Sequence, residues 1–326
     1  MGSAMTTSER PLTFIVRILA GDHGVRGVVE RVRTGRKDEV RNAEDVAAVI
    51  ASALEKETAM SLKGKHALVT GGSRGIGRGI ALKLAESGAR VAVHYYTNQA
   101  AAKDTLERVR KHGSDGILVQ ADVTKMDDVR RMFGEVRQAF GKLDVFVANA
   151  RPEAEKFYQK PMDITLEAWD QAMDSQARAF LVGVREAAGL MGSGGRIVAI
   201  TYAPGGVRAS WQPWVAMGSA KAALESLVRY FAVALAPRGI TVNSVSPGLT
   251  DDSVLQSFGE AAVDIARKWH GSGWTPMGRM GTPADIGNAV GLLCSPDAAW
   301  ITGQLIYADG GGSLVDTHLP LEIQRG

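Results

Sequence analysis

The chain has 326 residues, 45% of them hydrophobic and 22% charged, which is the balance of an ordinary globular protein. Its net charge of +3 is too small to indicate binding to nucleic acid or to an anionic membrane, and no apolar run approaches the roughly 18 residues of a membrane span. One cysteine, Cys294, excludes an internal disulfide, and its apolar neighbours lead us to expect a buried thiol. The start of the chain lacks the basic and apolar regions of a signal peptide, so we expect a cytoplasmic protein.

The first 60 residues differ in character from the rest. Residues 1–5 have the composition of a cloning remnant ahead of a native start at Met5. Residues 12–19 have strand composition, residues 25–32 alternate again, and residues 42–57 show the apolar spacing of a helix. Asn42 is a plausible helix cap, with Asp45 at the third helical position. We therefore predict a ββα unit over residues 6–60, which is too small for a stable core alone and should pack on the main domain or on a partner.

From residue 61 onward, strand-like runs alternate with amphipathic helical stretches. Short connections between such elements indicate a parallel sheet with helices on both faces. We predict a doubly wound α/β domain, the Rossmann fold, over residues 61–326. Its strands are expected at 66–70, 91–94, 116–120, 145–148, 196–201, 241–246 and 305–308, and its helices at 76–86, 100–111, 127–140, 166–191 and 216–235.

A glycine-rich loop joins the first of these strands to the first helix. Its glycines would let the backbone turn tightly and approach a pyrophosphate, and the helix N-terminus would supply free N–H groups. The spacing is Gly-x3-Gly-x-Gly rather than the common Gly-x-Gly-x-x-Gly fingerprint. The loop predicts a dinucleotide site formed by Gly71, Ser73, Arg74, Gly75, Ile76 and Gly77.

The end of the second strand bears on which dinucleotide binds. NAD users tend to carry a carboxylate there for the ribose 2′-hydroxyl, but residues 94–98 are His-Tyr-Tyr-Thr-Asn and include no acid. Arg74 in the glycine loop could meet a 2′-phosphate. Both observations favour NADP(H) over NAD(H), with Tyr95 beside the cofactor. His94 is expected to have a structural or ribose-side role.

Six motifs in order resemble the short-chain dehydrogenase/reductase superfamily, over about residues 62–315. Within it, residues 217–230 and 243–248 are most similar to enoyl-acyl-carrier-protein reductases. The resemblance implies that Asp122 contacts adenine, that Asn149 lines the nicotinamide ribose and that Lys221 holds the ribose hydroxyls. It also implies a homodimer or homotetramer, paired through helices 166–191 and 216–235. Pro247 and Gly248 would flank the nicotinamide. The six motifs are residues 70–77, Ala121-Asp122-Val123, Ala148-Asn149-Ala150, Lys221, Ser246-Pro247-Gly248 and Asp309-Gly310-Gly311.

The chain departs from the family's usual set of asparagine, serine, tyrosine and lysine. Gln176 aligns with the asparagine and Tyr202 with the serine. The tyrosine position carries Trp214 in one pattern and Met217 in the other, and neither side chain can exchange a proton at neutral pH. Only Lys221 is retained. The candidate catalytic residues are therefore Lys221, Tyr202, Trp214 and Gln176.

These residues leave more than one candidate for the proton donor. Tyr202 is one candidate, and the substrate's own acidic hydroxyl is another. Tyr158 and His270 are weaker ones, since a packed or structural role is the simpler interpretation of each.

The segment 250–275 is expected to close over the substrate. It carries Phe258, Trp269, His270 and Trp274, and Trp211 and Trp214 precede Lys221. These aromatic side chains favour a small substrate that is apolar, aromatic or bound to a carrier.

The leading hypothesis is an NADP(H)-dependent reductase of a carbonyl or conjugated enone with an atypical or substrate-supplied proton donor. The alternatives are a non-redox cyclase, dehydratase or isomerase on the same fold, and a protein that binds NADP(H) as a sensor or scaffold. No metal site is expected.

Overall fold

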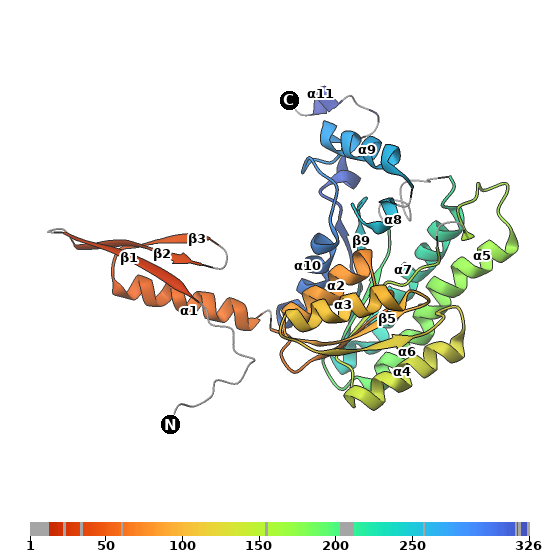
Figure 1. Cartoon of the computed structure of the whole chain (residues 1–326), viewed down its shortest axis with the longest axis horizontal. Coiled ribbons are helices and arrows are strands. Elements are labelled where there is room, and N and C mark those ends of the chain that lie inside the picture. Colours follow the sequence, from red (N-terminus) through yellow and green to blue (C-terminus); the bar gives the residue numbers. More distant parts are fainter. Residues whose placement is uncertain are drawn as a thin grey trace. The chain divides into compact units, whose positions relative to one another are not determined.

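The computed structural model divides into two units, Met1–Ser61 and Leu62–Gly326 (Figure 1). Residues 1–12, with the expected cloning remnant, and Trp211 lie outside the part of the chain that the structure describes. That part comprises residues 13–21, 24–32, 35–59, 61–153, 156–202, 212–256, 258–316, 318 and 321–324.

The N-terminal unit has three strands and a helix, so the predicted ββα unit lacked one strand. The antiparallel order is β1-β2-β3, with Val16 opposite Val29 and Gly27 opposite Val40. The third strand escaped prediction because four of its five residues are charged, which hides the alternation typical of a strand. The elements are β1 (Phe14–Gly21), β2 (Gly24–Arg31), β3 (Arg36–Val40) and α1 (Ala43–Ala59).

The start of α1 confirms the predicted cap. The Asn42 Oδ1 atom accepts a hydrogen bond from the Asp45 N–H at 2.7 Å, and the Asp45 carboxylate accepts one from the Arg41 N–H at 2.8 Å. These side chains satisfy backbone donors that the first helical turn leaves without partners.

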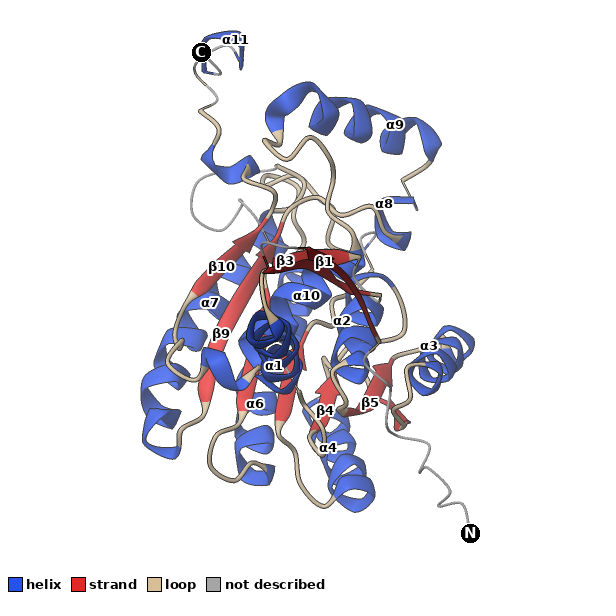
Figure 2. Cartoon of the chain, turned by 90° about the vertical axis from the view of Figure 1, so that its left-hand side faces the viewer, coloured by secondary structure: helices blue, strands red, loops and turns tan. Residues whose placement is uncertain are grey.

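The larger unit is built on the predicted parallel sheet (Figure 2), whose seven strands have the order β10-β9-β8-β7-β4-β5-β6. The strands β4, β5, β7 and β8 are largely buried and mostly apolar in sequence, as expected of parallel strands covered on both faces. The sequence of connections reverses between β4 and β7, and folds of this kind bind ligands in a crevice at the carboxyl ends of the strands at such a point. The strands are β4 (His66–Val69), β5 (Arg90–Tyr95), β6 (Gly116–Gln120), β7 (Val145–Ala148), β8 (Arg196–Ile200), β9 (Thr241–Pro247) and β10 (Leu305–Ala308).

Two cores lie on opposite faces of this sheet. Val145 and Val147 of β7 pack into one core with α2, α3 and α10, whereas Phe146 between them packs into the other with α4, α6 and α7. Cys294 is buried in the first core, as expected. The helices are α2 (Gly75–Glu86), α3 (Gln99–Lys111), α4 (Met126–Phe140), α5 (Leu166–Met173), α6 (Ala179–Leu190), α7 (Val215–Leu235), α8 (Ser253–Gln256), α9 (Glu260–Trp269), α10 (Pro283–Cys294) and α11 (Leu321–Gln324).

The helix predicted over residues 166–191 is interrupted. A π-helical turn at Asp174–Arg178 separates α5 from α6. This turn inserts an extra residue into the helical repeat and is buried at Ser175 and Gln176. It therefore changes which side chains face the end of β7.

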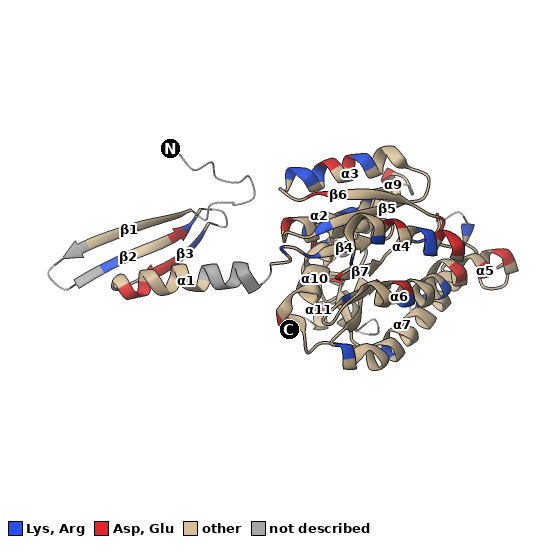
Figure 3. Ribbon diagram, turned by 90° about the horizontal axis from the view of Figure 1, so that it is seen from below, with Lys and Arg blue, Asp and Glu red and all other residues tan. Residues whose placement is uncertain are grey.

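Charged side chains of both signs share the outer helices, as Figure 3 shows for α3 and α4. Arg108 pairs with Asp104 on α3, and Arg131 pairs with Glu135 on α4. Within the described residues, no helix is long and apolar enough to cross a membrane.

Candidate active site

The glycine-rich loop lies at the crevice between β4 and β7 and is held there by His94 of β5. The Gly71 N–H donates to His94 Nδ1 at 2.9 Å, and the other ring nitrogen lies 3.1 Å from the Ala121 carbonyl oxygen. Nδ1 therefore accepts and Nε2 donates, which requires a neutral ring. Burial lowers the pKa of His94 to about 4, so the ring stays neutral at physiological pH. His94 is thus a structural link between the loop and the end of β6.

Close packing explains the glycines of this loop. Gly71 and Gly75 have φ angles of 64° and 54°, a region that L-residues with side chains rarely adopt. A Cβ at Gly77 would lie 2.1 Å from the Gly71 carbonyl oxygen, so only glycine allows α2 to start so near the loop. The loop consequently presents backbone N–H groups at the N-terminus of α2, the arrangement that binds a pyrophosphate.

Arg74 immediately precedes α2 and is exposed. It makes no ion pair within the described residues, so its guanidinium is available to a phosphate. By contrast, the Arg78 guanidinium is hydrogen-bonded within the protein. It donates to the Ser73 carbonyl at 3.0 Å and to Thr105 Oγ1 at 2.9 Å, and so anchors the loop. Tyr95 is buried in the core at the end of β5.

Asn149 and Ala150 follow β7 and tie it to the glycine loop. The N–H groups of both residues donate to Thr70 Oγ1, at 2.9 and 3.1 Å. The Asn149 side-chain amide donates to the Thr70 and Gly71 carbonyls at 2.9 and 3.3 Å. Asn149 therefore fixes the loop, and its predicted place at the nicotinamide ribose remains a prediction.

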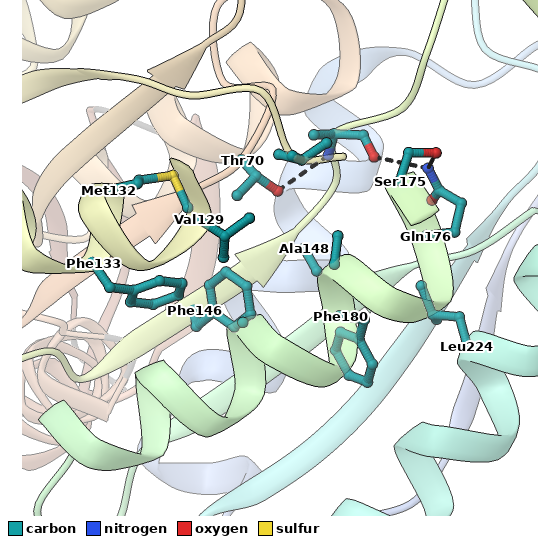
Figure 4. Close-up of a pocket in the computed structure, with 14 residues that line it drawn as sticks. Thr70, Val129, Met132, Phe133, Phe146, Ala148, Ser175, Gln176, Phe180 and Leu224 are labelled. Carbon is teal, nitrogen blue, oxygen red and sulfur yellow. Dashed lines mark hydrogen bonds between the residues drawn. The ribbon is translucent and has the colours of Figure 1, made fainter. Parts of the chain in front are cut away.

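Gln176 lies in the π-turn behind Ala150. Its amide donates to the Ala150 carbonyl at 3.1 Å, and the side chain is 2% exposed (Figure 4). A small cavity below it is lined mainly by apolar side chains, including Phe146 and Phe180. This cavity belongs to the core between α4, α6 and the sheet. Gln176 thus supports the backbone of the site from behind.

Lys221 is buried near the carboxyl end of β8. It projects from α7, is 5% exposed and donates through Nζ to the carbonyl of Ile200 at the end of β8. Since Ala148 pairs with Ala199, Ile200 lies level with Asn149. Sequence-distant motifs therefore converge at one edge of the sheet.

The charge state of Lys221 is strongly perturbed. Burial first, and then the positive charge of Arg151, lower the pKa of Lys221 to about 7, while Glu225 opposes the change. Glu225 lies one turn further along α7, is buried, and accepts a hydrogen bond from Thr201 Oγ1.

Trp214 and Met217, the two residues at the expected tyrosine positions, are placed differently. Met217 is 1% exposed and packs with Phe157 in an apolar cluster, against which Trp214 also packs. Trp214 directly precedes α7, and its ring lies 5.8 Å from that of Tyr202 and 6.2 Å from that of Tyr158. The Tyr158 ring also lies 5.9 Å from Phe258. Four separate segments thus contribute to one aromatic cluster.

The segment predicted as a lid contains α8, α9 and a π-turn at His270–Trp274. Trp269 stacks on Trp274 with a ring separation of 5.7 Å, so these two indoles pack on each other. His270 is buried and its Nδ1 shares a hydrogen bond with Thr275 Oγ1, which favours the structural interpretation.

The remaining motif residues serve backbone contacts. Asp122 Oδ1 accepts from the Thr124 N–H and hydroxyl at 3.0 and 2.7 Å, and Val123 lines the cavity of Figure 4. Pro247 ends β9, and Gly248 packs so tightly that a Cβ would lie 2.8 Å from the Asp309 Cα.

Sequence reasoning missed two charged residues, Arg151 and Asp252. Arg151 follows the Asn149-Ala150 motif, and its charge acts on Lys221, Arg74 and Asp252. Asp252 is 9% exposed beside Gly75. The available signal was positional: each follows a motif at the carboxyl end of a strand.

Comparison with known proteins places the chain among oxidoreductases. Residues 70–313 match the family model described as enoyl-(acyl carrier protein) reductase. The chain belongs to the short-chain dehydrogenase/reductase family. It is an oxidoreductase of this type, and the match leaves out the N-terminal unit.

Two curated relatives are reductases. The chain is 38% identical over 257 residues to 1-cyclohexenylcarbonyl-CoA reductase of Streptomyces collinus, covering 76% of this chain and 86% of the relative. It is 34% identical over 262 residues to tetrahydroxynaphthalene reductase of Pyricularia oryzae, covering 78% and 91%.

A solved structure is similar over the same region. The angucycline C-6 ketoreductase LanV with bound NADP is 37% identical, with a TM-score of 0.70 over 78% of this chain and 98% of that one. Within the described residues, no three His, Cys, Asp or Glu side chains cluster as metal ligands would.

Proposed function

We propose that the protein is an NADP(H)-dependent reductase of a carbonyl or conjugated enone whose proton donor is not the usual tyrosine. The observation that carries the proposal is the convergence of the glycine loop, Asn149 and buried Lys221 at one crevice beside Tyr202 and Trp214. The relatives support it, since they are named 1-cyclohexenylcarbonyl-CoA reductase, tetrahydroxynaphthalene reductase and angucycline C-6 ketoreductase.

The residues of the crevice fit NADP(H). The Gly71 and Gly75 backbone and the N-terminus of α2 suit a pyrophosphate, and exposed Arg74 suits a 2′-phosphate. A nicotinamide held at the other end supplies the hydride. Lys221 would hold the ribose hydroxyls, and the aromatic cluster would orient a flat substrate ring against the nicotinamide.

The magnitudes allow catalysis without the tyrosine. A positioned general acid contributes about 10²–10⁴ in rate, whereas orientation of the reactants can contribute about 7–11 kcal/mol. Tyr202 is one donor in reach of the cluster. An acidic hydroxyl on the substrate beside its carbonyl is the other, because it would stabilise the developing oxyanion itself.

The experiment that tests the proposal measures NADPH and NADH consumption with hydroxynaphthalenes, 1,3-diketones and simple ketones. We expect NADPH to be preferred and the acidic substrates to be reduced fastest. Conversion of a substrate without consumption of NADPH would instead support a cyclase, dehydratase or isomerase. Tight NADPH binding with no turnover of any substrate would support a sensor or scaffold.

We also propose that two copies pair through α5, α6 and α7. Tyr230 and Val233 of α7 are 73% and 79% exposed, and two of the three charged residues of α7, Lys221 and Glu225, are buried. The outer face of this long helix is therefore unusually apolar, which favours burial against a second copy.

A further inference from the structure

Arg151 brings a positive charge to the glycine loop. It follows Ala150, whose Cα would lie 3.0 Å from a Cβ on Gly71, so the segment after β7 packs directly against the loop. The Ala150 N–H donates to Thr70 Oγ1 at 3.1 Å, and the Gln176 amide donates to the Ala150 carbonyl at 3.1 Å. Hydrogen bonds therefore hold the backbone that carries Arg151 at a fixed place beside the loop.

The charge of Arg151 acts at both ends of the expected dinucleotide site. Among the described residues, it repels Arg74, which precedes α2, and Lys221 of α7, while Asp252 and Glu153 attract it. A dinucleotide with its 2′-phosphate at Arg74 and its nicotinamide ribose at Lys221 carries one charged group between these two points, the pyrophosphate. The position of Arg151 therefore suits the pyrophosphate.

The guanidinium of Arg151 retains donors for such a ligand. The side chain is partly buried, and Nη1 donates to the Pro152 carbonyl at 2.8 Å. Within the described residues this is its one hydrogen bond, and an arginine has five N–H donors and does not lose its charge in proteins. A phosphate that accepts from the remaining donors would form charge-assisted hydrogen bonds, which are stronger than those between neutral groups.

Lys221 responds to the same charge. It is 5% exposed, and burial first, then Arg151, lower its pKa to about 7, whereas Glu225 on the same helix opposes the change. About half of the unliganded molecules therefore carry a neutral lysine at pH 7. An anion that pairs with Arg151 would offset the repulsion, because a nearby negative charge favours the protonated form of an amine.

We propose that Arg151 binds the pyrophosphate of the dinucleotide and thereby couples dinucleotide binding to the uptake of a proton by Lys221. The inference rests on the proposed binding of NADP(H). The proton comes from solvent and adds to Nζ, and no other covalent bond forms or breaks. Binding thus converts a mixture of neutral and charged lysines into the charged form, which donates the stronger hydrogen bonds to ribose hydroxyls.

Isothermal titration calorimetry tests the contact with the pyrophosphate. Arg151→Met should raise the Kd for NADPH and for NADH alike, by about tenfold or more, because both carry a pyrophosphate. Arg74→Met should weaken NADPH alone, since NADH lacks the 2′-phosphate. Arg130→Met is the control of equal charge and should change neither Kd, because Arg130 pairs with Asp127 at 2.8 Å on α4. Circular dichroism checks that the variants fold.

The same titrations measure the proton when they are repeated at pH 7 in buffers of different ionisation enthalpy. NADH is the probe, because the 2′-phosphate of NADPH titrates near this pH and a pyrophosphate diester does not. The native protein should take up about half a proton for each NADH bound. Arg151→Met should take up less than half of the native amount, because its unliganded Lys221 is already more fully protonated. Lys221→Met should take up none.

Three outcomes would overturn the inference and leave the proposed function intact. They are an affinity for NADH that Arg151→Met does not change, proton uptake in Arg151→Met equal to that of the native protein, and uptake that persists in Lys221→Met. Binding of NADH by the native protein without any proton uptake would overturn it too. Failure of the native protein to bind either dinucleotide would overturn the proposed function as well.

Discussion

Lys221 combines two properties that rarely occur together in a lysine: it is buried, and a second cation acts on it. Desolvation and the charge of Arg151 lower the pKa of Lys221 from 10.5 to about 7. The side chain therefore titrates near neutral pH and exchanges between a charged and a neutral donor. Its protonation state, and not merely its position, should shape the chemistry of the site.

The pKa of Lys221 predicts a pH dependence of stability. Between pH 7 and pH 10.5 the unfolded chain binds this proton and the folded chain does not. Unfolding then takes up a proton, so the free energy of unfolding should rise with pH, by at most about 1.4 kcal/mol per pH unit. Urea denaturation of the native protein and of Lys221→Met at pH 7 and pH 9 measures this contribution. Identical pH dependence in the two proteins would contradict the lowered pKa.

Tyr202 predicts a dependence on substrate acidity. Burial raises the pKa of its phenol, which therefore keeps its proton and can act as a hydrogen-bond donor at neutral pH. Tyr202→Phe should lower kcat on a simple ketone by about 10²-fold or more, and by much less on a substrate with an acidic hydroxyl beside its carbonyl. Steady-state kinetics with both substrates provides the measurement.

Tyr158→Phe is the matched control for Tyr202→Phe, because Tyr158 belongs to the same aromatic cluster but is 39% exposed. We expect Tyr158→Phe to change kcat little with either substrate. Equal losses on the two substrates in Tyr202→Phe would show that the phenol supports the pocket and does not donate the proton.

The motif residues of the site could be found from the sequence because parallel strands bring their carboxyl ends to one edge. Gly71 was located from the glycine spacing between a strand and a helix, and Asn149 and Lys221 from the resemblance to the family's motifs. The contact of His94 with Ala121 and that of Asp252 with Gly75 could not be found in this way, since each depends on tertiary packing between segments that are distant in the sequence. A charged residue beside a motif has no sequence signal that tells a solvated side chain from a buried one.

Helices α2 and α10 approach each other unusually closely, which makes small residues necessary at their contact. A Cβ at Gly79 would lie 2.1 Å from the Pro283 carbonyl oxygen, and a Cβ at Gly287 would lie 2.5 Å from the Gly79 carbonyl oxygen. Both clashes are with backbone, which cannot rotate away. The contact therefore holds α2, whose N-terminus belongs to the expected dinucleotide site, against α10.

Gly79→Ala should accordingly destabilise the protein. We expect a loss of about 1–3 kcal/mol from overpacking, which exceeds the gain in helix propensity. Gly134→Ala in α4 is the control, because nothing lies within 4 Å of the added Cβ. It should stabilise by about 0.5–1 kcal/mol. Chemical denaturation measures both, and equal effects would refute the close contact.

At the scale of elements, periodicity predicted the seven parallel strands and most helices. It failed where side chains of a regular element do not follow the expected pattern. Strand β3 carries four charged side chains, which are exposed or only partly buried, so it shows no apolar alternation. The π-turn at Asp174–Arg178 keeps a helical sequence pattern, so only the backbone geometry distinguishes it from α-helix.

For the whole molecule, the apolar outer face of α7 predicts self-association. Val233→Glu introduces a charge at a position that is 79% exposed in the single chain and buried in the proposed pair. We expect sedimentation velocity to show a shift from dimer or tetramer toward monomer. Ile265→Glu on α9, 69% exposed but outside the proposed interface, should leave the assembly unchanged. A native protein that sediments as a monomer would contradict the proposal.

Cys294 has a practical consequence for measuring motion in this molecule. It is the one cysteine in the sequence, it is the last residue of α10 and 3% exposed, and burial raises the pKa of its thiol to about 12. Only a thiolate exposed to solvent reacts readily with a maleimide. The rate of modification by the maleimide therefore reports how often α10 opens away from the sheet. The measurement needs no introduced cysteine.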